Sequence, residues 1–119
     1  MTQDIYLDTS FVLDCIKFKL PLEEELDRIC DFKYRLVTFD LIQKELNNKP
    51  NEVVARIWLT KKKVIIKHTP KDNITLDECF LKLPINSIVA THDQTLKKSL
   101  KSKQLKSLTI RQKKYLIIT

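Results

Sequence analysis

Five carboxylates lie close to the ends of short apolar segments of the chain: Asp8, Glu45, Asp77, Glu78 and Asp93. If they converge in one crevice, each pair 4 Å apart is repelled by about 1 kcal/mol in bulk water and about 4 kcal/mol near a protein surface. A cluster of this kind normally holds a hard divalent cation with oxygen ligands, here one or two Mg²⁺ or Mn²⁺ ions. The ion generates hydroxide from bound water and stabilises charge on a phosphate. The predicted chemistry is metal-dependent phosphodiester hydrolysis.

Each of these acids also has an ordinary structural interpretation. Asp8 and Asp93 are good helix N-caps, each contributing about 1 kcal/mol. Glu45 is compatible with a solvated helix position. Asp77 and Glu78 suit the first turn of a helix, where negative charge is favoured.

The elements that must position the acids are short strands alternating with helices. The apolar runs predict strands over residues 5–7, 36–39, 64–66 and 88–90, with late strands over 108–110 and 115–118. Helical spacing and capping residues predict helices over 11–16, 22–30, 41–46 and 76–83, and others starting after Asn51 and Asp93. Residues 68–75 are expected to form a loop. The pattern predicts an α/β fold, a three-layer α/β/α arrangement with a mainly parallel central sheet.

Two details of these helices can be checked against the structure. Asp40 is expected to cap the helix over residues 41–46. The helix after Asn51 is expected to bury Val54, Ile57 and Trp58.

The carboxyl ends of parallel strands meet at one edge of a sheet, where functional groups gather. Asp8 directly follows the first strand, and Asp93 follows the strand over residues 88–90. If these two strands are neighbours, both carboxylates project into one crevice. Glu45 lies on the helix after the second strand, near the same rim.

Composition excludes several other kinds of site, because the chain of 119 residues contains no glycine. Glycine lets the backbone approach a phosphate closely. Its absence excludes the dinucleotide-binding fingerprint, the P-loop, the EF-hand loop and the G-x-S-x-G nucleophile elbow.

The charge is uneven along the chain. The net charge is +7, and residues 94–119 hold eight basic residues and no acidic ones, so the first 93 residues sum to −1. An acid-bearing body with a basic end is typical of polyanion binding, although lysine-rich surface helices would give the same composition. The candidate RNA-binding residues of this segment are Lys97, Lys98, Lys101, Arg111, Lys113 and Lys114.

We expect residues 1–119 to form one domain, with 94–119 as its basic C-terminal segment. No apolar run approaches the length of a membrane span, and the N-terminus does not resemble a signal peptide. The three cysteines are widely spaced and do not suggest zinc. A cytoplasmic location is the simplest expectation.

Four acidic motifs and a basic ending, in this order, resemble those of the PIN-domain ribonucleases. The motifs are IYLDTSFVL (5–13), LIQKEL (41–46), LDECF (76–80), IVATHDQTLKK (88–98) and LTIRQKKYL (108–116). The ending is most similar to the ribosomal-RNA-processing branch and its short archaeal relatives, and the VapC toxins belong to the same superfamily. The family commonly has two aspartates where this chain has Asp77-Glu78.

The resemblance implies an endoribonuclease that depends on Mg²⁺ or Mn²⁺ and acts on RNA, in particular an rRNA precursor. It implies metal ligands at Asp8, Glu45, Asp93 and one or both of Asp77 and Glu78. Ser10 would bond a ligand carboxylate or the phosphate, and Thr91 would support Asp93. The alternatives are a toxin ribonuclease with a cognate antitoxin, and a catalytically degenerate RNA-binding or assembly module. A homodimer is compatible with each of these, and no membrane partner is expected.

Overall fold

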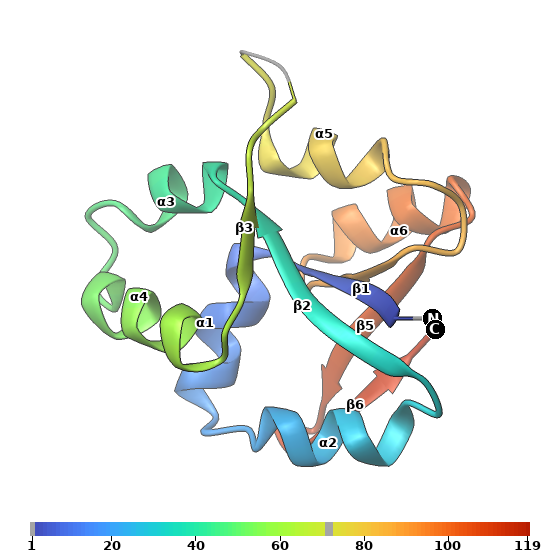
Figure 1. Ribbon diagram of the computed structural model, residues 1–119, viewed down its shortest axis with the longest axis horizontal. Helices are drawn as coiled ribbons and strands as arrows, with labels where there is room; N and C mark the ends of the chain where they lie inside the picture. Colours follow the sequence, from blue (N-terminus) through green and yellow to red (C-terminus); the bar gives the residue numbers. More distant parts are fainter. Residues whose placement is uncertain (1, 71–72) are drawn as a thin grey trace.

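The computed structural model describes residues 2–70 and 73–119, so residues 71–72 of the expected loop lie outside the described residues. The chain alternates strands with helices over most of its length, as the apolar runs predict (Figure 1). The strands are β1 (Thr2–Leu7), β2 (Lys33–Phe39), β3 (Ile65–Lys67), β4 (Ile88–Ala90), β5 (Lys106–Arg111) and β6 (Tyr115–Ile118). The helices are α1 (Thr9–Lys17), α2 (Leu22–Ile29), α3 (Leu41–Leu46), α4 (Glu52–Lys61), α5 (Leu76–Leu81) and α6 (Gln94–Ser102).

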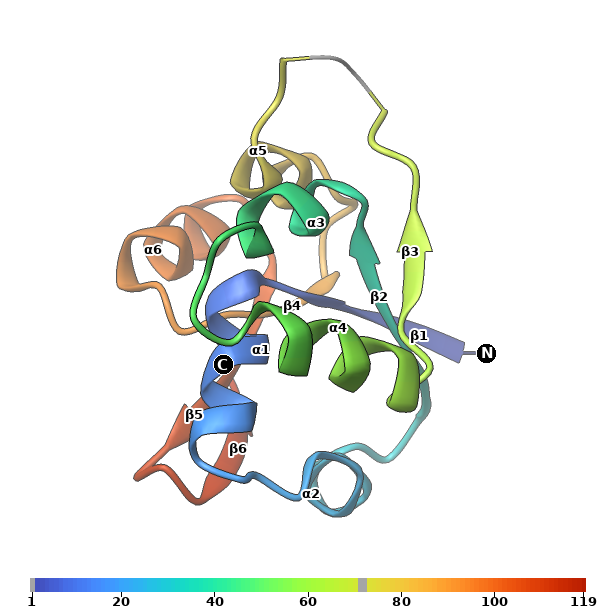
Figure 2. The ribbon, with the colours of Figure 1, turned by 90° about the vertical axis from the view of Figure 1, so that its left-hand side faces the viewer.

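The strands form one sheet in the order β3-β2-β1-β4-β5-β6, in which only the β5–β6 pair is antiparallel among the described strands. β1 and β4 are neighbours, with Tyr6 opposite Val89 and Leu7 opposite Ala90. Helices α5 and α6 lie together on one side of the sheet and α1, α2 and α4 on the other (Figures 1 and 2). The predicted α/β fold with a mainly parallel sheet is confirmed. No helix within the described residues is long and apolar enough to cross a membrane.

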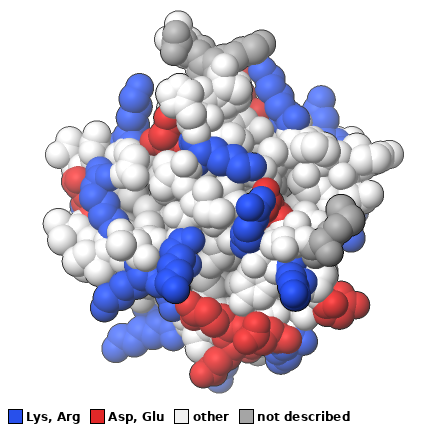
Figure 3. Space-filling view, in the orientation of Figure 1, with Lys and Arg blue, Asp and Glu red and all other residues white. Residues whose placement is uncertain are grey.

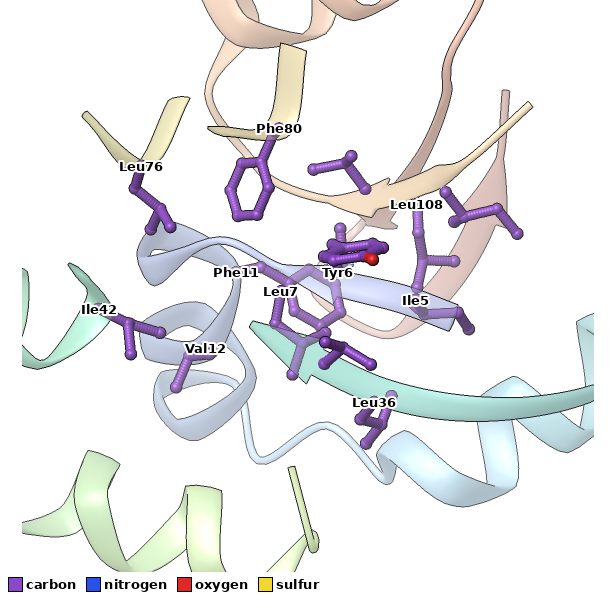
Figure 4. Close-up of a cluster of buried hydrophobic side chains, with 14 of the residues drawn as sticks. Ile5, Tyr6, Leu7, Phe11, Val12, Leu36, Ile42, Leu76, Phe80 and Leu108 are labelled. Carbon is purple, nitrogen blue, oxygen red and sulfur yellow. The ribbon is translucent and has the colours of Figure 1, made fainter. Parts of the chain in front are cut away.

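The core is built from the apolar strand residues and the inward faces of the helices (Figure 4). Tyr6 of β1 stacks on Phe39 of β2 with 5.6 Å between ring centroids. Phe80 of α5 packs edge-on against Tyr6 at 6.4 Å. Aromatic pairs in these geometries contribute about 0.5–1.5 kcal/mol beyond the burial of their area. This packing fixes α5 over the centre of the sheet and thereby the position of the acids in its first turn.

The predicted buried face of α4 is wrong. Val54 and Ile57 are 50% and 51% exposed and Trp58 is only partly buried, whereas Ala55 and Leu59 face the core. The reason is that apolar residues nearly surround this helix, so their spacing does not single out one face. The i, i+4 pair of Ala55 and Leu59 still gives a continuous contact with the core.

The predicted cap at Asp40 is also wrong. Its side chain makes no capping hydrogen bond to α3 and instead accepts bonds from the backbone N–H and hydroxyl of Thr69. These bonds hold the pKa of the Asp40 carboxyl below its usual range. Asp40 therefore ties the end of β2 to the chain leaving β3, instead of closing the first turn of a helix.

A chain without glycine must end its helices with other residues in the left-handed region. Lys19, Lys63 and Gln104, which follow α1, α4 and α6, have φ of 52°, 56° and 62°. After α4, the N–H of Lys63 bonds to the carbonyl of Thr60, and the N–H of Val64 to that of Leu59. This is the Schellman pattern, which normally uses glycine.

Replacing Lys63 with glycine is expected to stabilise the protein by about 1 kcal/mol, because left-handed backbone is unfavourable for a residue with a Cβ. Chemical denaturation measures the change. The matched control is Lys61→Gly within α4, which should destabilise the protein by about 1 kcal/mol. A loss of stability in both variants would contradict the expected relief at Lys63.

Candidate active site

Asp8 lies where β1 meets α1, and it is only 6% exposed. Its backbone N–H donates to the carbonyl of Ala90 at 2.9 Å, which joins the ends of β1 and β4. Its Oδ1 accepts from the N–H of Thr9 at 2.9 Å. Its Oδ2 accepts from the hydroxyls of Ser10 at 3.0 Å and Thr91 at 2.6 Å. Three donors therefore fix both oxygens of a buried carboxylate.

Thr91 links Asp8 to Asp93. Besides donating to Asp8, its Oγ1 accepts from the backbone N–H of Asp93 at 3.1 Å. The Thr91 hydroxyl was expected to support Asp93. It bonds to the backbone N–H of Asp93, and the carboxylate that it contacts is that of Asp8. Ser10 bonds the Asp8 carboxylate and also accepts from the N–H of His92 at 3.2 Å.

Asp93 is both a helix cap and a neighbour of the other acids. Its Oδ1 accepts from the N–H groups of Thr95 at 2.9 Å and Leu96 at 3.3 Å at the start of α6. Oδ1 of Asp93 thus caps α6, and its Oδ2 accepts no hydrogen bond from the described residues. Capping and a place in the site are therefore compatible for this residue.

Glu45 comes to the site from α3. Its Oε1 accepts from the hydroxyl of Thr9 at 2.5 Å, so adjacent residues of one segment hold Asp8 and Glu45. This bond orients an otherwise exposed glutamate toward the end of β1.

The structure separates Asp77 from Glu78. Asp77 lines the same pocket as Asp8, Glu45 and Asp93. Glu78 lies outside it, because its side chain turns back to the hydroxyl of Thr75, whose Oγ1 also accepts from the N–H of Glu78 at 3.1 Å. Thr75 therefore caps α5, and the Glu78 side chain bonds to the Thr75 hydroxyl and not to the backbone N–H that a capping box uses. Of the two residues that were expected at the metal site, only Asp77 lines the pocket shared by the other acids.

The four acids surround a pocket of about 510 Å³ at the carboxyl edge of the sheet. Their oxygens are the donors that Mg²⁺ and Mn²⁺ prefer. No group of three or more Asp, Glu, His or Cys side chains among residues 2–70 and 73–119 is close enough to enclose an ion. An open arrangement still fits Mg²⁺, which binds through one or two carboxylates and keeps several waters.

The electrostatic consequence of this arrangement is clearest at Asp77. Burial, followed by the charges of Asp8, Asp93 and Glu45, raises the pKa of its carboxyl from 3.8 to about 6. No described donor hydrogen-bonds this carboxylate. The ionised pocket therefore holds negative charge that a cation would neutralise.

Without metal, Asp77 should make the protein less stable as the pH rises from about 4 to 7. The folded state binds this proton more tightly than the unfolded state, so stability present at low pH is lost as the pH passes through the raised pKa. Thermal melting in EDTA should therefore show that Asp77→Asn gains stability over the wild type as the pH rises. The control Glu78→Gln removes a charge outside the pocket and keeps an oxygen that can accept from the Thr75 hydroxyl, so it should show no such gain. A constant difference between Asp77→Asn and wild type would contradict the prediction.

The predicted RNA-binding residues lie on α6 and on the β5–β6 hairpin. Lys97, Lys98 and Lys101 line a pocket of about 480 Å³ beside the start of β5. Burial, together with the charge of Arg111, lowers the pKa of Lys97. Lys113 lies over the ring of Phe18 at 5.6 Å, and Lys114 is exposed on the hairpin.

The charges on the face seen in Figure 3 are unevenly placed. Lysine and arginine side chains are spread over this face, and the acidic ones gather at its lower edge, over α2. The first turn of α2 carries Glu23, Glu24 and Glu25. Part of the acidic charge of the chain therefore lies on a helix remote from the carboxyl edge of the sheet.

Several residues near the site were not predicted. Thr9 orients Glu45, and Lys49 lines the acidic pocket. His92 Nδ1 contacts a carboxylate oxygen of Asp14, which ties the β4–α6 loop to α1. The polar run after β1 could have indicated Thr9, whereas Lys49 lies in a loop with no pattern of its own.

Comparison with known proteins identifies the class of this fold and site. The chain is 30% identical to ribonuclease VapC4 of Methanocaldococcus jannaschii over 120 aligned residues, which cover 91% of this chain and 90% of the relative. Its fold is similar to that of the PIN domain endonuclease Utp24, with a TM-score of 0.81 and 19% identity over 97% of this chain and 90% of that one. No protein-family profile matches the chain.

The chain belongs to the PIN-domain ribonucleases, a family of RNA-hydrolysing enzymes. The family resemblance predicted from the acidic motifs is confirmed.

Proposed function

We propose that the chain is a metal-dependent endoribonuclease that hydrolyses RNA phosphodiester bonds, with residues 1–119 forming the nuclease domain. The observation that carries the proposal is the convergence of Asp8, Glu45, Asp77 and Asp93 on one pocket. Their mutual repulsion is unfavourable unless a cation occupies the space between them.

The four carboxylates would hold Mg²⁺ or Mn²⁺ directly or through water. When bound, the ion supplies hydroxide and neutralises charge on the phosphate. The chain orients its acids before an ion binds: Ser10 and Thr91 fix Asp8, and Thr9 fixes Glu45. The N–H groups of α6 fix Asp93. Such support typically changes metal affinity or activity by about 10–100-fold.

The lysines of α6 are the proposed contacts to the RNA backbone. α6 begins at Asp93, so the strand bound along it would lead into the acidic pocket. These contacts would make affinity fall steeply with salt, because each neutralised phosphate releases counterions.

The test is cleavage of a labelled RNA by the wild-type protein in Mn²⁺ and in EDTA. We expect cleavage only with the metal, leaving 5′-phosphate and 3′-hydroxyl ends. RNA binding without cleavage in Mn²⁺ or Mg²⁺ would overturn the enzymatic proposal and favour the degenerate RNA-binding module.

A toxin ribonuclease is the second candidate, and the 30% identity to VapC4 over most of both chains favours it. The proposal of a role in rRNA processing rests on the resemblance of the basic ending, LTIRQKKYL. Expression in a bacterial host separates the two. Growth arrest that a neighbouring gene product relieves would favour the toxin, and growth without arrest would favour RNA processing.

A further inference from the structure

The acidic pocket is also lined by one lysine side chain, which forms no ion pair with the four carboxylates. Lys49 lines the pocket together with Asp8, Glu45, Asp77 and Asp93, and its side chain is exposed. It forms no ion pair with any carboxylate among the described residues. Its ammonium group is therefore available to an external anion at the rim of the pocket.

The loop that carries Lys49 is held firmly in place. Arg56 of α4 donates to the carbonyl of Gln43 at 3.1 Å and to Oδ1 of Asn47 at 2.9 Å. Asn48, in the left-handed region at φ 63°, donates its N–H to Oε1 of Glu52 at 2.9 Å. These bonds fix the backbone on both sides of Lys49. The lysine is presented at the rim by an ordered loop, so less conformational entropy is lost when it binds a ligand.

Further basic residues lie on α6, the helix that begins after Asp93. Lys49 lies in the loop between α3 and α4, and Lys97 lies on α6. Helices α4 and α6 lie on opposite sides of the sheet (Figures 1 and 2). Burial lowers the pKa of Lys97, and the like charge of Arg111 lowers it further. Lys49 follows Glu45 by four residues and Lys97 follows Asp93 by four residues, so a lysine lies close in the chain to an acid of the pocket on each of these two segments.

We propose that Lys49 is a phosphate-binding residue that contacts the RNA backbone beside the acidic pocket, opposite Lys97 and Arg111. The inference rests on RNA being the substrate under the proposed function. A strand held by Lys49 and Lys97 would cross the four carboxylates, with its scissile phosphate over them. A lysine suits this task because its flexible stem carries a compact charge with three donors.

The test is the affinity of a single-stranded RNA oligonucleotide, measured in EDTA at several salt concentrations so that no cleavage occurs. Lys49→Ala should weaken binding about tenfold at low salt and reduce the slope of log K against log salt by about 0.7. Lys49→Arg should keep both values close to wild type. The matched control is Lys33→Ala, at the amino end of β2 and the opposite edge of the sheet, which should leave both unchanged.

The cleavage assay separates the two proposals. For Lys49→Ala we expect KM to rise about tenfold at low salt with little change in kcat, which a merely structural role would not produce. An unchanged slope and KM in Lys49→Ala, with normal cleavage by the wild type, would overturn this inference alone. A reduced slope in Lys49→Ala, with no cleavage by the wild type, would support the phosphate contact and overturn the proposed nuclease.

Discussion

Replacing Asp8 with asparagine is expected to reduce Mn²⁺-dependent RNA cleavage by about a hundredfold or more. Asp8 is the most fixed of the four acids, because three donors hold its two oxygens where β1 and β4 meet. Asparagine keeps the shape of the side chain but removes its charge and one acceptor oxygen. A cation in the pocket would then lose an anionic ligand or the partner of a bound water.

The asparagine variant should fold, which makes a loss of cleavage interpretable. Its amide oxygen can accept from the N–H of Thr9, and its amide N–H groups can donate to the hydroxyls of Ser10 and Thr91, which rotate freely. Cleavage is followed with the labelled RNA, and circular dichroism reports folding. The matched control is Asp31→Asn, the same change at an exposed position before β2, which should cleave like wild type. Undiminished cleavage by a folded Asp8→Asn variant would remove the proposed role of Asp8.

The fold could be predicted because the sequence encodes it locally. β4 and the second half of β1 (residues 5–7) are short apolar runs, and the helix after each begins at an aspartate that caps it. Parallel pairing then places the ends of both strands at one edge. α4 could not be oriented in this way, because its apolar residues cover most of its circumference and only packing against the core selects Ala55 and Leu59.

The acids of the candidate site could be predicted from the sequence, but their orientations and hydrogen bonds could not. The choice between Asp77 and Glu78 depends on the rotation of α5, which the Phe80–Tyr6 packing and the N-cap at Thr75 determine. The bond from Thr91 to Asp8 joins residues on two strands and depends on their exact register. Lys49 lies at the pocket because Arg56 hydrogen-bonds to the residues before it and holds the loop in place. The sequence of this loop has no periodic pattern from which its position could be predicted.

Mn²⁺ should stabilise the wild-type protein strongly and the Asp8→Asn variant little. An ion that binds only the folded state adds about 2.7 kcal/mol at a hundredfold excess over its dissociation constant. For a domain of this size that corresponds to a rise in Tm of about 10 °C. The physical source is the pocket itself, because the ion neutralises a group of carboxylates in which burial, together with mutual repulsion, raises the pKa of Asp77 to about 6.

Thermal melting during a Mn²⁺ titration checks this expectation without knowledge of the RNA substrate. Asp31→Asn should follow the wild-type curve, since its carboxylate lies outside the pocket. If Asp8→Asn rises as much as wild type, the ion binds elsewhere and the four acids are not its ligands. If neither protein responds, the site does not hold the metal, and the fold would then serve RNA binding through α6. A rise in wild type alone ties the geometry of Asp8 to metal binding independently of any catalytic assay.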